Sequence, residues 1–504
     1  MFIKTLPGEK FWGGHAAAGI HMPYKPGFTD DLRTTTYDNQ TNYTLMSNMG
    51  RVIRSESAFK FTVLEDGIEI EGGSDIFSGI VGENLRDAYK YTAEKIYAPK
   101  AGIPPKEFFS KPQFNTWIEL IYDQNQEDIL RYAQTVADSG YPHGILMIDD
   151  NWQEDYGVWT FHEGRFSDPK AMMDRLHELG FKVMLWVVPF VSPDSATFRM
   201  LRKKGVFVKT QDGETYITHW WNGYSAVLDL SNPVAWDWFK GEMDRLQAEY
   251  GVDGFKFDAG GPQYYPENCV YHKEGMWGDK QTQLFCDFAA QYPYNELRET
   301  IDQPHLPCCE RLCDKAHSWD RQGLNTLAPN SIAQSLMGYQ FICPDMIGGG
   351  EYSVFFGGNP RLDRELIVRM AQAGALLPMM QFSLAPWRVL SEEMNGYCFA
   401  AAKLHEQFGD FIYDAVVKAC ETGEAVLQPL EYAYPHKGYV EIMDEYILGG
   451  RYLVAPVYKK DEYTRDVVLP EGRWRADDGV EYDGGCTVTV DAPLGRLPWF
   501  ELIG

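Results

Sequence analysis

The spacing of apolar and polar residues changes near residue 111, which predicts two kinds of fold in one chain. Residues 59–64 and 68–71 alternate apolar with polar side chains on either side of Asp66-Gly67. Such alternation is typical of a β-hairpin, because an Asp-Gly pair fits the tight turn between paired strands. We therefore predict a β-sandwich domain over residues 1–108. The aromatic, glycine-rich run at 11–15 is interpreted as a sheet edge; the alternative is a loop that reaches a neighbouring site.

Beyond residue 111, short apolar runs alternate with segments whose apolar residues recur at helical spacing. One such helix runs from Gln126 to Ser139, and Asp168-Pro169 opens the next with a capping residue and a proline at the first position. This alternation indicates parallel strands joined by crossover helices. The predicted strands are 114–120, 144–150, 182–190, 252–258, 306–311, 321–326, 340–345 and 376–381, of which 321–326 has the least regular pattern.

Eight such units predict a (β/α)8 TIM barrel for residues 109–430, and hence the α/β fold class. After residue 430 the pattern returns to short strands at 452–457, 466–469 and 487–490, with Asp-Gly and Gly-Gly turns between them. We predict a small C-terminal β-sandwich over residues 431–504. The expected plan is an α/β barrel between two β-sandwich domains.

The predicted strand at residues 252–258 ends in charged side chains. Successive side chains of a strand point to opposite faces, so Lys256 and Asp258 share one face and two phenylalanines share the other. In a parallel barrel the outer face packs on helices, and active sites form at the carboxyl ends of the strands. We therefore place Lys256 and Asp258 in an active site. The alternative is a buried ion pair that only closes the strand.

Acidic residues gather at the predicted carboxyl ends of several strands. The set comprises Asp149, Asp150, Asp258, Glu310, Asp314, Asp320 and Asp345. With Lys256, Arg311 and several tryptophans, it suits a neutral polyhydroxylated ligand, whose hydroxyls need acceptors and whose apolar faces stack on indole rings. Paired carboxylates are also what glycoside hydrolysis requires. A divalent cation is the competing ligand, but no EF-hand-like loop or paired-histidine motif supports it, so no metal and no cofactor is predicted.

The formal charge of −26 over 504 residues limits the expected partners. A field of this sign repels phosphate, so neither nucleic acid nor an anionic membrane is expected. No apolar run is typical of a signal peptide or of a membrane span. The nine cysteines are scattered, and the cluster of Cys308, Cys309 and Cys313 lacks the paired spacing of a zinc site. We expect a cytoplasmic protein with reduced thiols that binds a small oligosaccharide or glycoside, and homo-oligomer formation stays open.

Several of these segments resemble glycoside hydrolase family 31, in the order in which that family carries them. Gly251-Val-Asp-Gly-Phe-Lys-Phe-Asp258 is similar to the strand that bears the family's nucleophile, and Pro344-Asp-Met-Ile-Gly-Gly349 resembles its (H/A)-D-I-G-G segment. The early barrel and the domain that follows the barrel also match, at 165–169, 180–186, 444–457 and 468–474. The resemblance covers nearly the whole chain.

The resemblance implies a retaining glycosidase with Asp258 as the nucleophile. It implies Asp320 as the acid/base by position, because the family usually shows a W-x-G-D motif there. This chain reads His317-Ser-Trp-Asp-Arg-Gln-Gly-Leu324, without the glycine, and Asp314 is the alternative acid/base. Arg311 matches an arginine that the family uses on sugar hydroxyls.

Two departures from the family's α-glucosidases bear on the sugar. The usual R-N-H-S segment is replaced by Gln381-Phe-Ser-Leu-Ala-Pro-Trp-Arg388, and the second strand ends in Ile148-Asp-Asp-Asn-Trp152, close to the I-D-D-G-W of related α-galactosidase families. The chain resembles the α-galactosidase branch of family 31, which implies an exo-acting α-galactosidase. The residues implied to hold the sugar are Asp149, Asp150, Trp186, Lys256, Arg311 and Asp345.

Other interpretations stay open at this point. An α-glucosidase or α-xylosidase would use the same catalytic residues, and a sulfoquinovosidase would need a cationic pocket for the sulfonate. A barrel that binds sugar without hydrolysing it is the alternative from another class. Asp150 has its own alternative, in which it points outward and caps the following loop.

Overall fold

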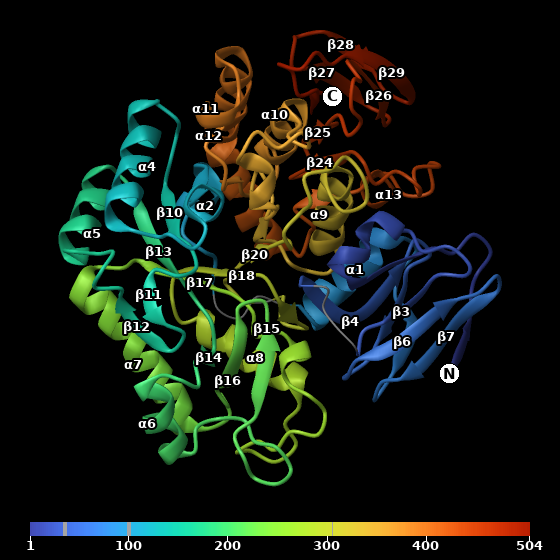
Figure 1. Ribbon diagram of the computed structural model, residues 1–504. Coiled ribbons are helices and arrows are strands. Elements are labelled where there is room, and N and C mark those ends of the chain that lie inside the picture. Colours follow the sequence, from blue (N-terminus) through green and yellow to red (C-terminus); the bar gives the residue numbers. More distant parts are fainter. Residues whose placement is uncertain (34–37, 98–101, 305) are drawn as a thin grey trace.

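The computed structural model describes residues 1–33, 38–97, 102–304 and 306–504, and it has the three predicted parts (Figure 1). Sheets at the two ends of the chain flank a central eight-stranded sheet. The predicted fold class, a TIM barrel between two β-sheet domains, is confirmed.

The N-terminal domain is built from two sheets. One has the order β1 (Phe2–Lys4), β7 (Gly67–Gly72), β6 (Phe59–Val63) and β3 (Thr29–Asp31), and the other has the order β19 (Thr300–Ile301), β4 (Gln40–Ser47), β5 (Arg51–Arg54) and β8 (Phe77–Ile80). The predicted hairpin is formed by β6 and β7. The run interpreted as a sheet edge is β2 (Phe11–His15), which pairs with β4. Because β19 comes from the barrel region of the chain, the two domains share one sheet.

The central sheet is a barrel of parallel strands. Its order is β21 (Ile342–Cys343), β20 (Cys309–Arg311), β18 (Tyr294–Leu297), β17 (Gly254–Phe257), β13 (Lys182–Val187), β10 (Ile145–Ile148), β9 (Gln113–Asn115) and β22 (Gln381–Phe382). A parallel bridge between Ile347 and Phe382 brings the last strand back toward the first. Side chains on the outer face, such as Phe255 and Phe257, are buried under the helices as predicted.

One predicted barrel strand is wrong. Residues 321–326 form turns and the short 3-10 helix η3 (Leu324–Thr326), and the missing strand is β18 (Tyr294–Leu297). The sequence of β18 hides it, because Asn295 and Glu296 interrupt the apolar pattern. Both polar side chains are buried and hydrogen-bonded, Asn295 to backbone and Glu296 to two neighbouring side chains.

Helices cover the barrel on its outside. They include α4 (Gln126–Asp138), α5 (Pro169–Glu178), α6 (Ala196–Lys204), α7 (Pro233–Tyr250), α8 (Gly278–Ala289), α9 (Leu327–Leu336), α10 (Arg364–Ala375) and α12 (Glu392–Thr422). Asp168 caps α5 as predicted, because its side chain accepts a hydrogen bond from the Ala171 N–H, and Pro169 occupies the first position. A hairpin of β15 (Ile217–Trp220) and β16 (Gly223–Val227) is inserted between β13 and α7.

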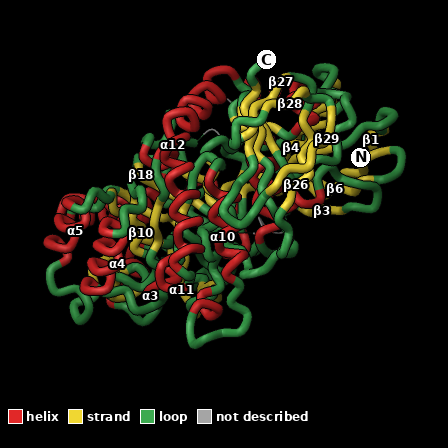
Figure 2. Tube along the Cα trace, turned by 90° about the horizontal axis from the view of Figure 1, so that it is seen from above, coloured by secondary structure: helices red, strands yellow, loops and turns green. Residues whose placement is uncertain are grey.

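The C-terminal domain consists of a six-stranded sheet and a strand pair. The sheet order is β23 (Leu427–Gln428), β24 (Tyr446–Leu448), β25 (Tyr452–Val454), β30 (Trp499–Leu502), β27 (Arg473–Ala476) and β28 (Glu481–Asp483), and the pair is β26 (Thr464–Leu469) with β29 (Cys486–Asp491). Figure 2 shows both terminal domains on one side of the molecule, with α4 and α5 of the barrel on the other. Among the helices of the described residues, none has the length and apolar character needed to cross a bilayer.

Candidate active site

A cavity of about 310 Å³ lies at the carboxyl ends of the barrel strands. The predicted residues that line it are Asp149, Asp150, Trp186, Lys256, Asp258 and Arg311, and they are joined by Asp38, Trp117, Tyr122, Trp221, Arg298, Asp314 and Met346. Pockets for small molecules usually measure roughly 300–1,000 Å³, so this one is sized for a small ligand. Its mixture of carboxylates, cations and indole rings suits a ligand with many hydroxyls.

Asp258 follows β17 directly and is held on several sides. Its Oδ2 accepts a hydrogen bond from Trp186 Nε1 at 2.9 Å, and its Oδ1 lies 3.2 Å from Arg298 Nη2. Burial alone would raise the pKa of Asp258, but the Arg298 guanidinium and the Lys256 ammonium outweigh it and hold the pKa below its ordinary value. The carboxylate is therefore ionised and borders the cavity.

A sharp turn directly after β17 fixes the backbone that carries Asp258. Asp258 is followed by Ala259 at a φ of +54° and Gly260 at +76°. A Cβ on Gly260 would lie 2.5 Å from the Phe285 ring, so this turn requires glycine there. A non-glycine residue at positive φ stores local strain, which commonly occurs at functional sites.

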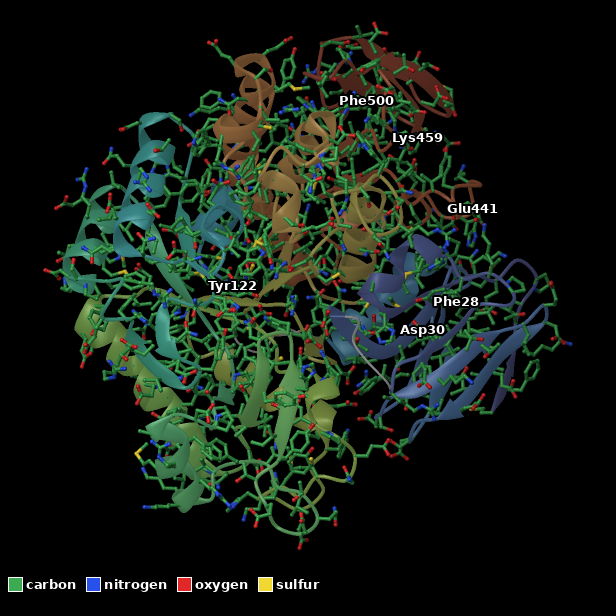
Figure 3. All side chains as sticks on the ribbon, viewed as in Figure 1. Phe28, Asp30, Tyr122, Glu441, Lys459 and Phe500 are labelled. Atoms are coloured by element: carbon green, nitrogen blue, oxygen red, sulfur yellow. The ribbon has the colours of Figure 1, made fainter. Side chains whose placement is uncertain are left out.

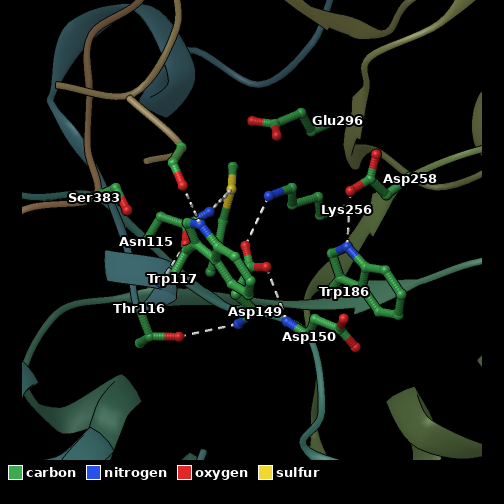
Figure 4. A network of polar contacts seen from close by, with 12 residues as sticks. Asn115, Thr116, Trp117, Asp149, Asp150, Trp186, Lys256, Asp258, Glu296 and Ser383 are labelled. Atoms are coloured by element: carbon green, nitrogen blue, oxygen red, sulfur yellow. Dashed lines mark hydrogen bonds and ion pairs between the residues drawn. The ribbon is translucent and has the colours of Figure 1, made fainter. Parts of the chain in front are cut away.

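Lys256 pairs with Asp149 rather than with Asp258. Its Nζ lies 2.7 Å from Asp149 Oδ2, and both side chains are almost fully buried (Figure 4). Burial would lower the pKa of Lys256, but the Asp149 carboxylate raises it above its ordinary value. The alternative in which Lys256 and Asp258 form a closed ion pair therefore does not describe this strand end.

Asp150 points into the cavity and not outward. It is 2 % exposed, and it accepts hydrogen bonds from Asn222 Nδ2 at 2.5 Å and from the Tyr156 hydroxyl at 3.2 Å. Burial and the neighbouring Asp149 raise the pKa of Asp150 to about 7. Asn222 lies at the turn of the β15–β16 hairpin, so an inserted element positions this carboxyl group.

Arg311 gathers three carboxylates at the end of β20. Its Nε donates to Glu296 Oε1 at 3.1 Å, and its Nη1 donates to Asp314 Oδ1 at 2.8 Å and to Asp345 Oδ1 at 3.0 Å. Burial and the Asp314 carboxylate raise the pKa of Asp345 to about 7. For Asp314, Arg311 and Arg298 outweigh the effect of burial and lower the pKa. Asp345 does not line the cavity; it supports it through Arg311.

The structure does not bring Asp320 to the cavity. Asp320 is exposed in the loop after β20, where it accepts hydrogen bonds from the Ser318 hydroxyl and the Gln322 N–H. These bonds lower its pKa. The alternative, Asp314, lines the cavity together with Asp258. Of the two residues considered for the acid/base, Asp314 borders the cavity and Asp320 is not among its lining residues. Glu310, also expected at a strand end, is buried and bonds the Thr300 hydroxyl outside this cavity.

Several site residues were missed by sequence reasoning. They are Asp38, Trp117, Tyr122, Trp221, Asn222, Glu296 and Arg298. Arg298 follows β18 immediately, so recognising that strand would have placed an arginine at the barrel mouth. Trp221 and Asn222 lie on the inserted hairpin, for which the barrel pattern offers no signal.

One buried cluster has the ligand types of a metal site. Glu296, Cys309 and Cys343 offer ligand atoms within 4.8 Å of one another. Burial raises the pKa of both thiols, and Glu296 already bonds Arg311 and Gln381 Nε2, the latter at 2.7 Å. A metal would need both thiolates and would compete with Arg311 for Glu296, so the residues present do not favour one.

Comparison with protein families identifies two matching segments. Residues 104–304 match the model described as "Glycosyl hydrolases family 31 TIM-barrel domain", and residues 423–501 match "Glycosyl hydrolase family 31 C-terminal domain".

Curated relatives extend this similarity over most of the chain. Myogenesis-regulating glycosidase of Mus musculus is 32% identical over 425 residues, which cover 82% of this chain and 59% of the relative. Alpha-glucosidase 2 of Bacillus thermoamyloliquefaciens is 24% identical over 412 residues, which cover 75% of this chain and 50% of that protein. The chain thus spans only half to three fifths of the length of these relatives.

Solved structures share the fold. A GH31 alpha-xylosidase from a soil metagenome, complexed with xylose, superposes with a TM-score of 0.84 at 20% identity, and the match covers 99% of this chain and 79% of that one.

Proposed function

The chain belongs to glycoside hydrolase family 31, and we propose from this that it is a retaining, exo-acting α-glycosidase whose preferred sugar is α-linked galactose. The observation that carries the proposal is the ionised Asp258 at the cavity, held by Trp186 and Arg298. A carboxylate kept charged in a buried site is suited to attack an anomeric carbon.

In the first step, Asp258 attacks carbon one of the sugar while the bond to the leaving oxygen breaks. We assign the proton that this oxygen takes to Asp314. The Asp314 and Asp345 carboxylates bond the same nitrogen of Arg311, so they titrate as a pair, and the raised pKa of Asp345 keeps a proton at this end of the cavity near pH 7. Movement of that proton to Asp314 would complete the acid.

In the second step, water replaces Asp258 at carbon one. Asp314, now ionised, takes a proton from the water, and the sugar leaves with the configuration with which it arrived. The Arg298 guanidinium then again faces a free carboxylate at Asp258, which stabilises Asp258 as the leaving group.

Galactose is supported by the acceptors around the cavity. The pair of Asp149 and Asp150 follows β10, and Asp150 is tied to the inserted hairpin through Asn222. An axial hydroxyl needs an acceptor in a different place from an equatorial one, and this second carboxylate offers one. Trp186 and Trp221 line the walls against which the apolar face of the sugar would stack.

A panel of aryl α-glycosides tests both parts of the proposal. p-Nitrophenyl α-galactoside should be hydrolysed faster than the α-glucoside and the α-xyloside. Faster turnover of the α-glucoside or the α-xyloside would change the assigned sugar but keep the assigned glycosidase reaction. No turnover of any of the three would favour a barrel that binds sugar without hydrolysing it.

The nucleophile is tested by removing it. Asp258→Ala should lose at least about 10⁴-fold in kcat, because the covalent route is closed. External azide should restore turnover of the activated aryl galactoside in this variant and not in the unchanged protein. Near-normal activity without azide would remove Asp258 from this role.

A further inference from the structure

A second cavity, of about 630 Å³, lies between the N-terminal domain and the barrel. Its walls include His21, Phe28 and Asp30 from the N-terminal domain and Asp314, Lys315 and Arg321 from the barrel. Figure 3 shows Phe28 and Asp30 where the N-terminal domain borders the barrel. Asp314 lines this cavity as well as the one that contains Asp258, so the two cavities meet at that side chain.

The position of Asp314 indicates which part of a substrate the second cavity would hold. A general acid must touch the oxygen of the leaving group, and the sugar that is attacked lies on the side of Asp258. Asp314 is 40% exposed, so it is open to a ligand. A leaving group bonded to the sugar would therefore extend past Asp314 into the second cavity.

Lys315 carries an ammonium that lacks an anionic partner. Its side chain is 4 % exposed, and Nζ lies 3.7 Å from Cys313 Sγ. Within the described residues, no carboxylate oxygen comes within ion-pair distance of this Nζ. A thiol sulfur is a weak acceptor, so a buried ammonium held only by Cys313 Sγ is costly, and lysines are almost never this buried unless they are paired with an anion. The group can only donate, so a ligand that relieves the cost must present acceptor oxygens.

The carboxylates of the same cavity are already engaged. Asp30 Oδ2 lies 2.9 Å from His15 Nδ1, its Oδ1 accepts the N–H of Asp31, and Asp314 bonds Arg311. Arg321, at the exposed rim, has no ion pair with any residue that the structure describes. The cavity thus leaves two cations for a ligand in a chain whose net charge is −26.

We propose that this cavity is the leaving-group subsite and that it selects leaving groups bearing an oxyanion, which Lys315 and Arg321 bind. Carboxylate, sulfate and phosphate share the required chemistry. The inference rests on the proposed glycosidase function and on Asp314 as the acid/base, and it adds the class of leaving group.

Matched pairs of aryl glycosides test the charge alone. The 4-carboxyphenyl glycoside is compared with the 4-carbamoylphenyl glycoside, and the 4-sulfophenyl with the 4-sulfamoylphenyl glycoside. The sugar is the one whose α-glycosyl fluoride the protein hydrolyses fastest, so a wrong choice of galactose changes the substrate and not the test. Each ratio of kcat/KM is measured in the unchanged protein, in Lys315→Met and in Arg321→Gln, which cancels differences in leaving-group reactivity.

We expect each variant to lower the ratio of anionic to neutral substrate by about tenfold or more for at least one pair, the size of one charge-assisted hydrogen bond. Lys203→Gln, on the exposed face of α6, should leave the ratio unchanged. If Lys315→Met does not fold, Arg321→Gln at the rim still carries the test. Ratios equal to those of the unchanged protein in the folded variants would overturn the subsite. Absence of turnover with every glycosyl fluoride would instead overturn the proposed function, and the subsite with it.

Discussion

The side chains around Asp258 keep it ionised, whereas burial and the neighbouring Asp149 raise the pKa of Asp150. Asp258 has Arg298 and Trp186 on its two oxygens, and Asp150 has the charge of Asp149 beside it. The two aspartates both follow a barrel strand and are both buried. Their different pKa values therefore come from the cation beside Asp258 and the carboxylate beside Asp150.

The choice between Asp314 and Asp320 is testable with one matched pair of variants. Asp314→Asn should lower kcat/KM by about 10²- to 10⁴-fold on an alkyl galactoside, because the leaving oxygen then receives no proton. It should lose far less on α-galactosyl fluoride, since fluoride leaves without one. Asp320→Asn, in an exposed loop, is the control and should behave as the unchanged protein on both. Steady-state kinetics that show the opposite pattern would return the role to Asp320.

Ionisation of Asp150 should be visible in sugar binding. With a pKa of about 7, its carboxylate gains charge between roughly pH 6 and 8 and becomes a stronger acceptor for a sugar hydroxyl. We expect the affinity of Asp258→Ala for galactose to rise over that interval, by up to about tenfold. Calorimetry at several pH values measures it. The double variant with Asp150→Asn should bind more weakly and without this pH dependence; a slope that persists would assign the titration to another group.

Among the single residues of the site, the sequence predicted those that lie at the carboxyl ends of the predicted strands. Asp149, Asp150, Lys256, Asp258 and Arg311 were placed in one site because parallel strands end at the same edge, and they do line one cavity. Asp314, the cavity residue proposed as the acid/base, lies on a loop, six positions before the residue to which the motif with a missing glycine pointed. Loop conformation depends on contacts with distant segments, and no periodicity reports it.

The elements that the sequence missed are those that break the usual patterns. β18 carries the buried polar residues Asn295 and Glu296. The Glu296 carboxylate accepts hydrogen bonds from Arg311 and Gln381 inside the barrel. The β15–β16 hairpin is an insertion, and its turn supplies Asn222 and Trp221 to the site. The alternation of short apolar runs with helical segments predicted the other seven barrel strands.

We expect a buried carboxyl group to make the stability of the C-terminal sheet depend on pH. Glu445, just before β24, is 1 % exposed; its Oε1 accepts the Val468 N–H, and burial raises its pKa to about 8. Between its ordinary pKa and about 8, the folded state binds more protons than the unfolded state. Stability from this group is therefore present at low pH and is lost as the pH rises through 8.

Glu445→Gln should remove this dependence. We expect its free energy of unfolding to exceed that of the unchanged protein at pH 8.5 by on the order of 1 to 4 kcal/mol, and the difference to shrink toward pH 5. Urea unfolding at both pH values measures it. Glu441→Gln, at an exposed position, is the control. A variant that is less stable at pH 8.5 would contradict the assignment.

At the scale of the whole molecule, the N-terminal domain supports the backbone of the site. Gln40 in β4 donates from Nε2 to the carbonyl oxygens of Arg298 at 2.8 Å and Arg311 at 3.0 Å. Its Oε1 accepts a hydrogen bond from Gln334 Nε2 at 2.6 Å, and Arg54 in β5 pairs with Asp302 of the barrel region. The two domains are therefore one structural unit around the active site, which the division of the sequence into domains did not foresee.

Gln40→Ala should weaken both stability and catalysis. The change leaves buried carbonyl groups without donors, which costs about 2 to 4 kcal/mol in unfolding free energy, and it frees the backbone that carries Arg298 and Arg311. Urea unfolding and kcat/KM on the aryl galactoside measure the two effects. Gln211→Ala, at an exposed loop position, should change neither. Loss of stability with unchanged kcat/KM would show that the N-terminal domain supports the fold and not the site.

The central claim is that Asp258 becomes covalently bonded to the sugar. It is tested most directly by treating the protein with a fluorinated α-galactosyl fluoride that forms the glycosyl-enzyme faster than water releases it, followed by mass spectrometry of the digested chain. We predict one sugar per chain, on the peptide that contains Asp258, and no label on Asp258→Ala. A label on Asp150, Asp314 or any other carboxylate, or rapid turnover of the reagent by Asp258→Ala, would contradict the account.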